Sequence, residues 1–242
     1  MSTPLIQLRD VTKTYGRGSA AFRALRGVGL DIEAGEFVAV MGASGSGKST
    51  LMNILGCLDT PTSGSFLFGG QALQGLSKEQ RALIRRHYLG FIFQGFNLLA
   101  RTSALENVEL PLLYRGISRR ERRARAREAL DAVGLLPWQG HSSNELSGGQ
   151  QQRVAVARAI ATDPQVLFAD EPTGNLDSKN SEEVMELIAD LNRTKGITVV
   201  LVTHEPEMAA YAQRVVTFHD GLIKSDVRQE VGVEGRLERK VA

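Results

Sequence analysis

Hydrophobic and polar residues alternate along the first part of the chain, which is typical of β-strands with one buried face. One alternating run contains Ile6, Leu8 and Val11, and a later run extends from Leu30 to Val38 across a glycine-containing turn. A third, shorter run at residues 66–68 lies between two glycine-containing turns. The pattern therefore predicts a β-rich lobe at the N-terminal end.

From Ser77 to about Val133 the hydrophobic spacing becomes helical. Capping boxes mark two helix starts, Ser77 with Gln80 and Ser118 with Glu121. A strand at residues 89–93 and Pro111 interrupt this region, so we expect several short helices rather than one long one.

After Gln150 the pattern alternates between helices and buried strands, which predicts a parallel sheet. We expect helices to about 162 and at 181–192 and 206–213, strands at 166–169 and 198–202, and a hairpin at 215–223. The expected fold is α/β, with an antiparallel β lobe beside a mostly parallel sheet. We predict a single domain over 1–242, in which the β-rich lobe and the core occupy about 1–76 and 147–224, a helical insert about 77–146, and a polar C-terminal tail about 225–242.

Composition supports one globular domain, since 42% of the 242 residues are hydrophobic and 23% are charged. No apolar run approaches the roughly 18–20 residues that cross a bilayer, and the first residues do not resemble a secretory signal. The single cysteine, Cys57, excludes an internal disulfide and fits a reducing cytoplasm.

The formal net charge of +2 is small for a nucleic-acid-binding protein, so no nucleic acid is expected as a partner. Basic residues nevertheless crowd one predicted helix: Arg119, Arg120, Arg122, Arg123, Arg125 and Arg127. A solvated helix face explains this cluster most simply, and anionic lipid headgroups or an acidic partner are the alternatives.

The strand at 37–41 leads directly into a phosphate-loop pattern, G-x-x-x-x-G-K-[ST], at residues 42–49. In such a loop successive backbone N–H groups point at phosphate oxygens, and the following helix adds the positive end of its dipole. We expect Lys48 to neutralise the β and γ phosphates and the Ser49 hydroxyl to ligate Mg²⁺. The predicted nucleotide ligands are Gly42, Ser44, Gly45, Ser46, Gly47, Lys48, Ser49 and Thr50.

A second apolar strand, at residues 166–169, ends in the carboxylates Asp170 and Glu171. Ligands bind at the carboxyl ends of parallel strands, so both carboxylates are candidates for the same site. Because side chains alternate along a strand, we predict different roles, Asp170 as a magnesium ligand and Glu171 as the base that activates water. A helix-capping role for Glu171 is the alternative.

The segment Leu146-Ser147-Gly148-Gly149-Gln150 precedes a long predicted helix and offers a second glycine-lined helix start. By itself it has two interpretations. Ser147 can be a simple N-cap, or the segment can be a second anion site.

These three motifs, in this order and spacing, resemble the nucleotide-binding domain of the ABC ATPases, from Tyr15 to about Ile223. The resemblance implies a P-loop NTPase-type core, ATP and Mg²⁺ as cofactors, and an ATP-dependent homodimer. In that family the LSGGQ segment of one chain closes over the ATP held by another. Ser147, Gly148, Gly149 and Gln150 are thereby implied as ligands in trans.

The resemblance also implies roles for four residues that are weak signals alone. Tyr15 matches the aromatic residue that stacks on adenine. Gln94 matches the glutamine that reaches Mg²⁺ and the attacking water. Asp177 lies in the loop that crosses between the two domains, and His204 matches the histidine at the γ-phosphate. We therefore expect Glu171, His204, Gln94 and Lys48 as catalytic residues, and Ser49, Gln94 and Asp170 as metal ligands.

The amino-acid sequences of segments 49–59, 90–94 and 170–177 are similar to those of the lipoprotein-release and macrolide-export group. That similarity implies a separate integral-membrane permease, to which a periplasmic adaptor can be added, and a location at the cytoplasmic face of the inner membrane. Phe96, Leu98 and Leu99 are candidates for a groove that receives a helix of the permease, with ordinary core packing as the alternative.

Two other functions compete with export. A regulatory ATPase that drives a cell-wall hydrolase through a membrane partner is hardly distinguishable by sequence. ABC-type ATPases that act on nucleic acids are disfavoured, because about a hundred residues separate the phosphate loop from LSGGQ without sustained heptads or cysteine ligand sets.

Overall fold

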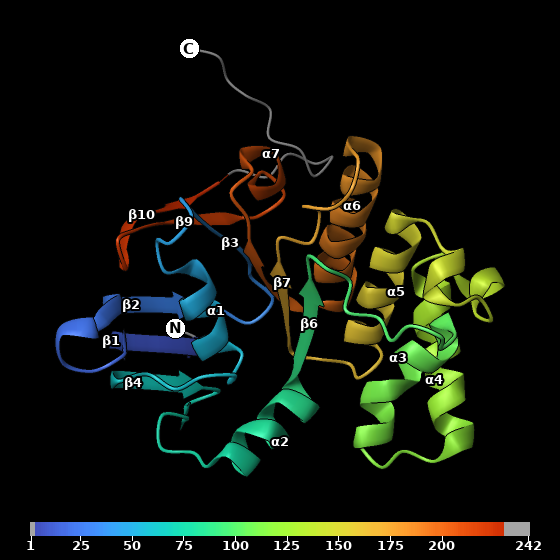
Figure 1. The fold of residues 1–242 in the computed structure, drawn as a ribbon, viewed down its shortest axis with the longest axis horizontal. Helices are drawn as coiled ribbons and strands as arrows, with labels where there is room; N and C mark the ends of the chain where they lie inside the picture. Colours follow the sequence, from blue (N-terminus) through green and yellow to red (C-terminus); the bar gives the residue numbers. More distant parts are fainter. Residues whose placement is uncertain (1–2, 230–242) are drawn as a thin grey trace.

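A computed structural model describes residues 3–229, in which two β-sheets share the chain (Figure 1). The antiparallel sheet has the strand order β2-β1-β4-β5, and the larger sheet has the order β10-β9-β3-β8-β7-β6. The first sheet contains β1 (Ile6–Tyr15), β2 (Phe22–Ile32), β4 (Ser63–Phe68) and β5 (Gln71–Ala72). The second contains β3 (Phe37–Gly42), β6 (Leu89–Phe93), β7 (Val166–Asp170), β8 (Thr198–Val202), β9 (Arg214–His219) and β10 (Leu222–Arg228).

In the larger sheet the pairs β9–β3, β3–β8, β8–β7 and β7–β6 are parallel, and the β9–β10 hairpin is antiparallel. The helices are α1 (Lys48–Leu55), α2 (Lys78–Tyr88), α3 (Ala104–Tyr114), α4 (Arg119–Ala132), α5 (Gly148–Ile160), α6 (Ser178–Lys195) and α7 (Pro206–Ala209). Short 3-10 turns lie at Gly18–Ala20, Leu136–Trp138 and Ser143–Glu145. The structure thus confirms the predicted α/β fold with a mostly parallel sheet and an antiparallel lobe.

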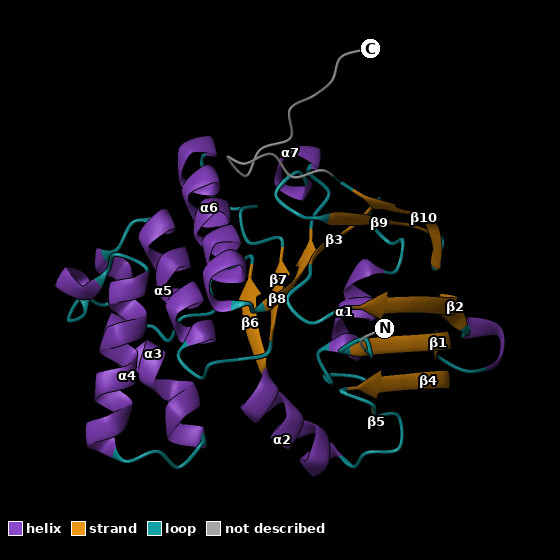
Figure 2. Ribbon diagram, turned by 180° about the vertical axis from the view of Figure 1, so that it is seen from behind, coloured by secondary structure: helices purple, strands orange, loops and turns teal. Residues whose placement is uncertain are grey.

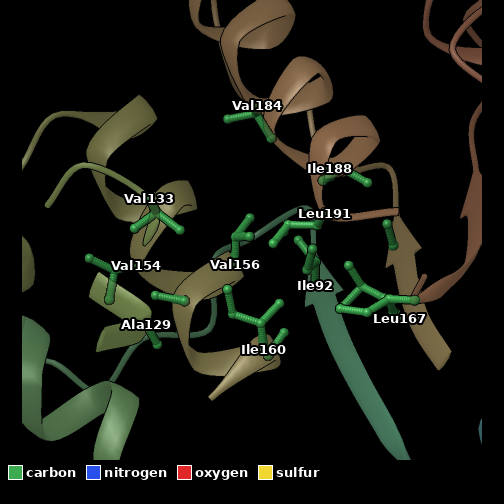
Figure 3. Close-up of a cluster of buried hydrophobic side chains, with 14 of the residues drawn as sticks. Ile92, Ala129, Val133, Val154, Val156, Ile160, Leu167, Val184, Ile188 and Leu191 are labelled. Atoms are coloured by element: carbon green, nitrogen blue, oxygen red, sulfur yellow. The ribbon is translucent and has the colours of Figure 1, made fainter. Parts of the chain in front are cut away.

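The two faces of the parallel sheet are buried in separate cores, because consecutive side chains of a strand point in opposite directions. Phe37 and Ala39 of β3 face helices α3 to α6, whereas Val38 and Val40 face α1 and the antiparallel sheet. Figure 2 shows these layers from behind. Figure 3 shows the first core, where Ile92 and Leu167 of the sheet meet Val156 and Ile160 of α5 and Ile188 of α6.

Three predicted boundaries differ in the structure. Pro111 was expected to interrupt the helices but lies inside α3, one turn before its end, where it removes a single backbone hydrogen bond. Helix α7 ends at Ala209 instead of Gln213, because the Gln213 backbone N–H donates to Phe37 O and so joins the sheet. Strand β10 continues to Arg228, past the expected start of the polar tail, and residues 230–242 of that tail lie outside the described residues.

Of the predicted capping boxes, Ser77 with Gln80 forms completely. At α4 only half of the box is present, since Ser118 accepts from the Glu121 backbone N–H but the Glu121 side chain makes no return bond to the Ser118 N–H in the described structure. No helix within residues 3–229 is long and apolar enough to cross a membrane.

Candidate nucleotide-binding site

The phosphate-loop pattern forms the turn between β3 and α1, at the carboxyl edge of the parallel sheet. Gly47 has φ +108°, and a Cβ at this position would lie 2.8 Å from the Ala24 carbonyl oxygen. A Cβ at Gly42, where φ is +149°, would collide with the Phe218 carbonyl and the Ser46 hydroxyl. Glycine is therefore required at both ends of the loop, because a Cβ would collide with neighbouring backbone and both positions have positive φ.

Lys48 is buried inside this loop with its ammonium group held by the loop itself. Its Nζ donates to the carbonyl oxygens of Gly42 at 2.7 Å and Ala43 at 2.9 Å. The Ser46 hydroxyl is also buried and has no hydrogen-bond partner among the described residues. A fixed positive charge beside an unpaired hydroxyl at a helix start fits a phosphate group.

Asp170 and Glu171 follow at the end of β7, in register with Val202 of β8 and close to the loop. The pKa of Asp170 is raised, chiefly by burial and then by the negative charge of Glu171, whereas the Lys48 ammonium opposes the rise. The structure thus brings Lys48 and Asp170 into one electrostatic environment, as the sequence predicted.

Glu171 departs from the strand in a left-handed backbone conformation, with φ +44°. For a residue with a Cβ, such a conformation costs about 1–3 kcal/mol and persists only where the surroundings enforce it. Its backbone N–H donates to Val202 O at 2.9 Å. Its Oε1 lies 2.9 Å from Nδ1 of His204, which follows β8. Two of the predicted catalytic residues are therefore in direct contact.

Gln94 follows β6, whose last residue Phe93 pairs with Asp170. Its side chain packs against Gly174, where a Cβ would lie 2.5 Å from Gln94 Nε2, and its carbonyl accepts from Asn175 Nδ2 at 3.0 Å. The loop after Gln94 is thus tied to the turn that follows Glu171.

Tyr15 is 40% exposed at the end of β1. Its hydroxyl donates to Asp59 Oδ2 at 2.9 Å, and Lys13 Nζ lies 4.9 Å from the centre of its ring. The pKa of Tyr15 is raised by burial and by the bond to Asp59, while a bond to Thr50 of α1 opposes the rise. The phenol stays neutral with its ring beside the phosphate-loop helix, which suits a flat aromatic ligand.

The LSGGQ segment lies elsewhere, at the start of α5. The Ser147 hydroxyl accepts from Gln150 N at 3.3 Å, and Gln150 Oε1 accepts from Ser147 N at 2.9 Å, which completes a capping box. A Cβ at Gly148 would lie 3.5 Å from Leu176, and one at Gly149 would collide with Asn180. The N-cap interpretation of Ser147 is therefore confirmed, and no hydrogen bond within residues 3–229 joins this segment to the phosphate loop.

Asp177, close to the LSGGQ segment, caps α6. Its Oδ1 accepts from Asn180 N at 2.9 Å, and its Oδ2 accepts from Asn180 Nδ2 at 2.7 Å. These two bonds lower the pKa of Asp177.

The three predicted magnesium ligands supply a hydroxyl, an amide and one carboxylate, from Ser49, Gln94 and Asp170. The described residues contain no group of three or more His, Cys, Asp or Glu side chains that could hold a metal. Mg²⁺ commonly binds through one or two protein oxygens together with phosphates and water, so this donor set fits Mg²⁺ bound with a nucleotide.

A cavity of about 350 Å³ beside Gly45 was not predicted. It is lined by Phe22, Arg23, Ala24, Arg26, Asp220 and Gly221 as well as Gly45. Arg23 and Arg26 belong to the alternating strand β2, and the hairpin turn at 220–221 is far away in the sequence. No local pattern marks these residues, since tertiary packing alone brings them to the loop.

A second cavity, of about 480 Å³, lies between α2, α3 and β6. Phe91, Phe93, Pro111 and Tyr114 are among its lining residues, whereas Phe96, Leu98 and Leu99 are not. Leu98 packs against the core instead. Leu98 therefore fits the core-packing alternative, whereas Leu99 is exposed and its place in a partner groove stays a prediction.

Fold and site together define a nucleotide-binding α/β domain with its phosphate loop, acidic strand end and histidine on one sheet edge. Residues 25–174, more than half of the chain, match the ABC transporter family. The chain therefore belongs to the ABC transporter family, as one of its ATP-binding ATPase domains.

Curated relatives include an export protein of Pseudomonas syringae pv. syringae (strain B728a), "Pyoverdine export ATP-binding/permease protein PvdT", which is 52% identical over 95% of this chain. Another is "Macrolide export ATP-binding/permease protein MacB" of Chlorobium luteolum (strain DSM 273 / BCRC 81028 / 2530), 51% identical over 95% of the chain. The chain spans only 35% and 34% of the lengths of these two relatives.

Among solved structures, the ATP-binding cassette MJ0796, described as dimeric and bound to ADP and Pi, is 45% identical with a TM-score of 0.85. The match covers 93% of this chain and 99% of that one. The cbiO1 protein from Clostridium perfringens has the same TM-score at 27% identity, over 94% of this chain and 89% of that one.

Proposed function

We propose that the chain binds ATP with Mg²⁺ and hydrolyses it between two copies of itself, and that this cycle drives a membrane permease. One observation carries the proposal. Lys48, Asp170 and the Glu171–His204 pair converge on one sheet edge, and the LSGGQ helix start, although similarly suited to an anion, makes no hydrogen bond to the phosphate loop within residues 3–229.

Each residue has a physical task in this cycle. Lys48 and the loop amides hold the triphosphate in place, and Ser49 and Asp170 hold the metal. Mg²⁺ supplies charge neutralisation to the phosphate oxygens. Glu171 accepts the proton of the attacking water, and His204 keeps the carboxylate oriented through the 2.9 Å contact. Gln94 contacts the turn after Glu171 and so is suited to align the water.

A second copy completes the site in this proposal. The start of α5 presents the exposed Ser147 and the half-buried Gly148 next to the Asp177 loop, where the first helical N–H groups are suited to a phosphate of another chain. Two structures of the similar cassette MJ0796 are described as dimeric, and one of them is a post-hydrolysis state. ATP then favours the dimer because it contacts both chains only in the closed state.

Glu171→Gln tests this proposal, because it keeps the shape of the side chain and removes the base. We expect the hydrolysis rate to fall about 10³-fold, with ATP still bound and a dimer accumulating in size-exclusion chromatography with ATP and Mg²⁺. A variant that hydrolyses ATP at the parental rate, or that stays monomeric with ATP bound, would contradict it.

We further propose a separate export permease as the partner, which would hold this chain at the cytoplasmic face of the inner membrane. Two curated relatives are named for pyoverdine and macrolide export and for a permease. The apolar cavity of about 480 Å³ beside the Gln94 loop has a size and lining that suit a short helix of such a partner. Asn97 lines this cavity, so a helix seated there would touch the loop that carries Gln94.

Tyr114, at the cavity and 68% exposed, offers a test of the partner surface. Tyr114→Arg should abolish co-purification of the permease and leave the hydrolysis rate of the isolated chain unchanged. Val227→Arg on β10, which replaces a side chain that is 56% exposed away from this cavity, is the control and should retain the partner. Equal permease recovery with both variants would refute this surface.

A further inference from the structure

Gln152 of α5 is a buried amide that no part of the proposed cycle uses. Its relative exposure is 0%. Its Nε2 donates to the Pro172 carbonyl oxygen at 2.6 Å and lies 3.5 Å from the Phe93 carbonyl oxygen. Its Oε1 is buried and has no hydrogen-bond partner among the described residues.

The two carbonyls flank the residues of the proposed chemistry. Phe93 immediately precedes Gln94, and Pro172 immediately follows Glu171. The buried Gln152 amide thus contacts the backbone next to Gln94 and next to Glu171. Its bond on the Glu171 side is the shorter of the two.

The Glu171 backbone needs such support. Its left-handed conformation, φ +44°, is held on one side by the bond from its own N–H to Val202 O at 2.9 Å. The bond from Gln152 to Pro172 O fixes the chain on the other side. Strained residues persist where neighbouring contacts over-determine them, and these two bonds bracket Glu171.

Asn175 supplies a second connection on the outer side, through Nδ2 to Gln94 O at 3.0 Å. The buried Gln152 and the exposed Asn175 therefore both connect the Gln94 segment to the Glu171 segment. If one segment moved, these two amides would move the other with it.

A purely structural role explains Gln152 poorly. A buried oxygen without a partner destabilises a folded protein, and methionine would fill nearly the same volume while losing the bond to Pro172 O. These two effects on stability partly cancel, so stability alone gives no strong preference for the amide.

We propose that Gln152 is a positioning residue that sets the placement of Glu171 relative to Gln94. The proposal rests on the hydrolytic roles proposed above for those two residues. Gln152 touches neither nucleotide nor water and acts through the two backbone segments.

Gln152→Met separates this role from packing. We expect thermal stability equal to that of the parent or slightly lower, because the lost bond to Pro172 O offsets the removal of the unpaired oxygen. We further expect a kcat for ATP hydrolysis lowered about 10- to 100-fold and a KM for ATP within about twofold of the parent. A folded Gln152→Met protein with the parental kcat would overturn the proposal.

Asn192→Leu is the matched control. Asn192 is another buried amide, with Nδ2 donating to Gly35 O and Ile197 O at 2.8 Å each, at the opposite edge of the sheet. This variant should lose stability and keep kcat. Similar kcat losses in both variants would show a general effect of core amides and would also overturn the proposal.

Gln152→Glu adds a measurement, the pH dependence of activity, that a role in packing alone would not change. At about pH 8 the carboxylate cannot donate to Pro172 O, and burial raises the pKa of such a group, so that towards about pH 6 its protonated form regains a donor. The activity ratio of this variant to the parent should therefore rise as the pH falls. A flat ratio would overturn the proposal even if Gln152→Met failed to fold.

Assays of the parent protein and of Glu171→Gln alongside distinguish a failure of the positioning role from a failure of the proposed function. If Glu171→Gln is inactive and Gln152→Met is fully active, the positioning role fails and the proposed function stands. If Glu171→Gln is as active as the parent, the proposed function fails.

Discussion

The phosphate loop and the LSGGQ segment are both glycine-rich helix starts, yet their polar groups are arranged in opposite ways. In the loop, Lys48 is buried and held by backbone carbonyls, and the Ser46 hydroxyl is buried without a partner among the described residues. In the LSGGQ segment, Ser147 is exposed and already paired with Gln150.

This difference indicates how each segment meets an anion. The phosphate loop is a cradle that one chain builds by itself, with a positive charge placed in advance. The LSGGQ segment is stable without a ligand and faces outward. An anion that it contacts therefore has to be brought to it, and in our proposal a second copy of the chain brings it.

The strongest way to break the comparison is Lys48→Ala. Removing the charge from the cradle should weaken ATP binding about 100-fold or more, because charged hydrogen bonds to the phosphates are lost. Isothermal titration with ATP and Mg²⁺ measures this effect. Lys224→Ala, at an exposed position of β10, is the control and should bind like the parent. ATP affinity equal to that of the parent in Lys48→Ala would mean that the loop is not the binding site.

Ser147→Arg examines the other half of the comparison. We expect ATP affinity within about twofold of the parent, because the cradle is intact, but a kcat about 10- to 100-fold lower, because a bulky side chain blocks the contact between chains. Ser118→Arg is the matched control, since Ser118 is also an exposed N-cap, at α4, and loses a similar capping energy of about 1 kcal/mol. Equal kcat values for Ser147→Arg and Ser118→Arg would contradict a specific role of the LSGGQ segment in hydrolysis.

Asp170→Asn should have the smallest measured effect of the three variants. It should raise the thermal stability of the ATP-free protein rather than lower it. Burial and the charge of Glu171 raise the pKa of Asp170, so the folded state binds its proton more tightly than the unfolded state does. Stability from this group is therefore lost as the pH rises through the raised pKa, and a neutral amide avoids that loss. At neutral pH the ATP-free variant should therefore melt at a higher temperature than the parent.

Calorimetry with and without ATP and Mg²⁺ completes that experiment. The parent should gain thermal stability from Mg²⁺ beyond that from ATP alone, and Asp170→Asn should not. A variant that melts below the parent without ligands, or that keeps the magnesium effect, would contradict the assignment.

The sequence predicted most of the sheet and the meeting of several candidate site residues at one of its edges, for physical reasons. Residues 42–49 form a contiguous loop after a buried strand, and parallel strands bring Asp170 and His204 to the same edge as that loop. Both features follow from local pattern and strand direction alone.

Other features depended on contacts between distant segments. The sequence gives no sign that Gln152 reaches Phe93 and Pro172, since only the packing of α5 against the sheet creates this contact. The left-handed backbone of Glu171 was equally hidden, because tertiary bonds enforce it. Pro111 was misjudged because the helix continues through it to Tyr114, so the lost bond costs α3 less than the burial of its apolar residues gains.

Mixing the two impaired variants, Lys48→Ala and Ser147→Arg, tests most directly whether each site is shared between chains. In a mixed dimer one site carries both defects and the other carries neither. If each site works independently, an equimolar, freely exchanging mixture should regain about a quarter of the parental ATPase activity. Sites complete within one chain would leave the mixture as inactive as its two components, and that result would contradict the account.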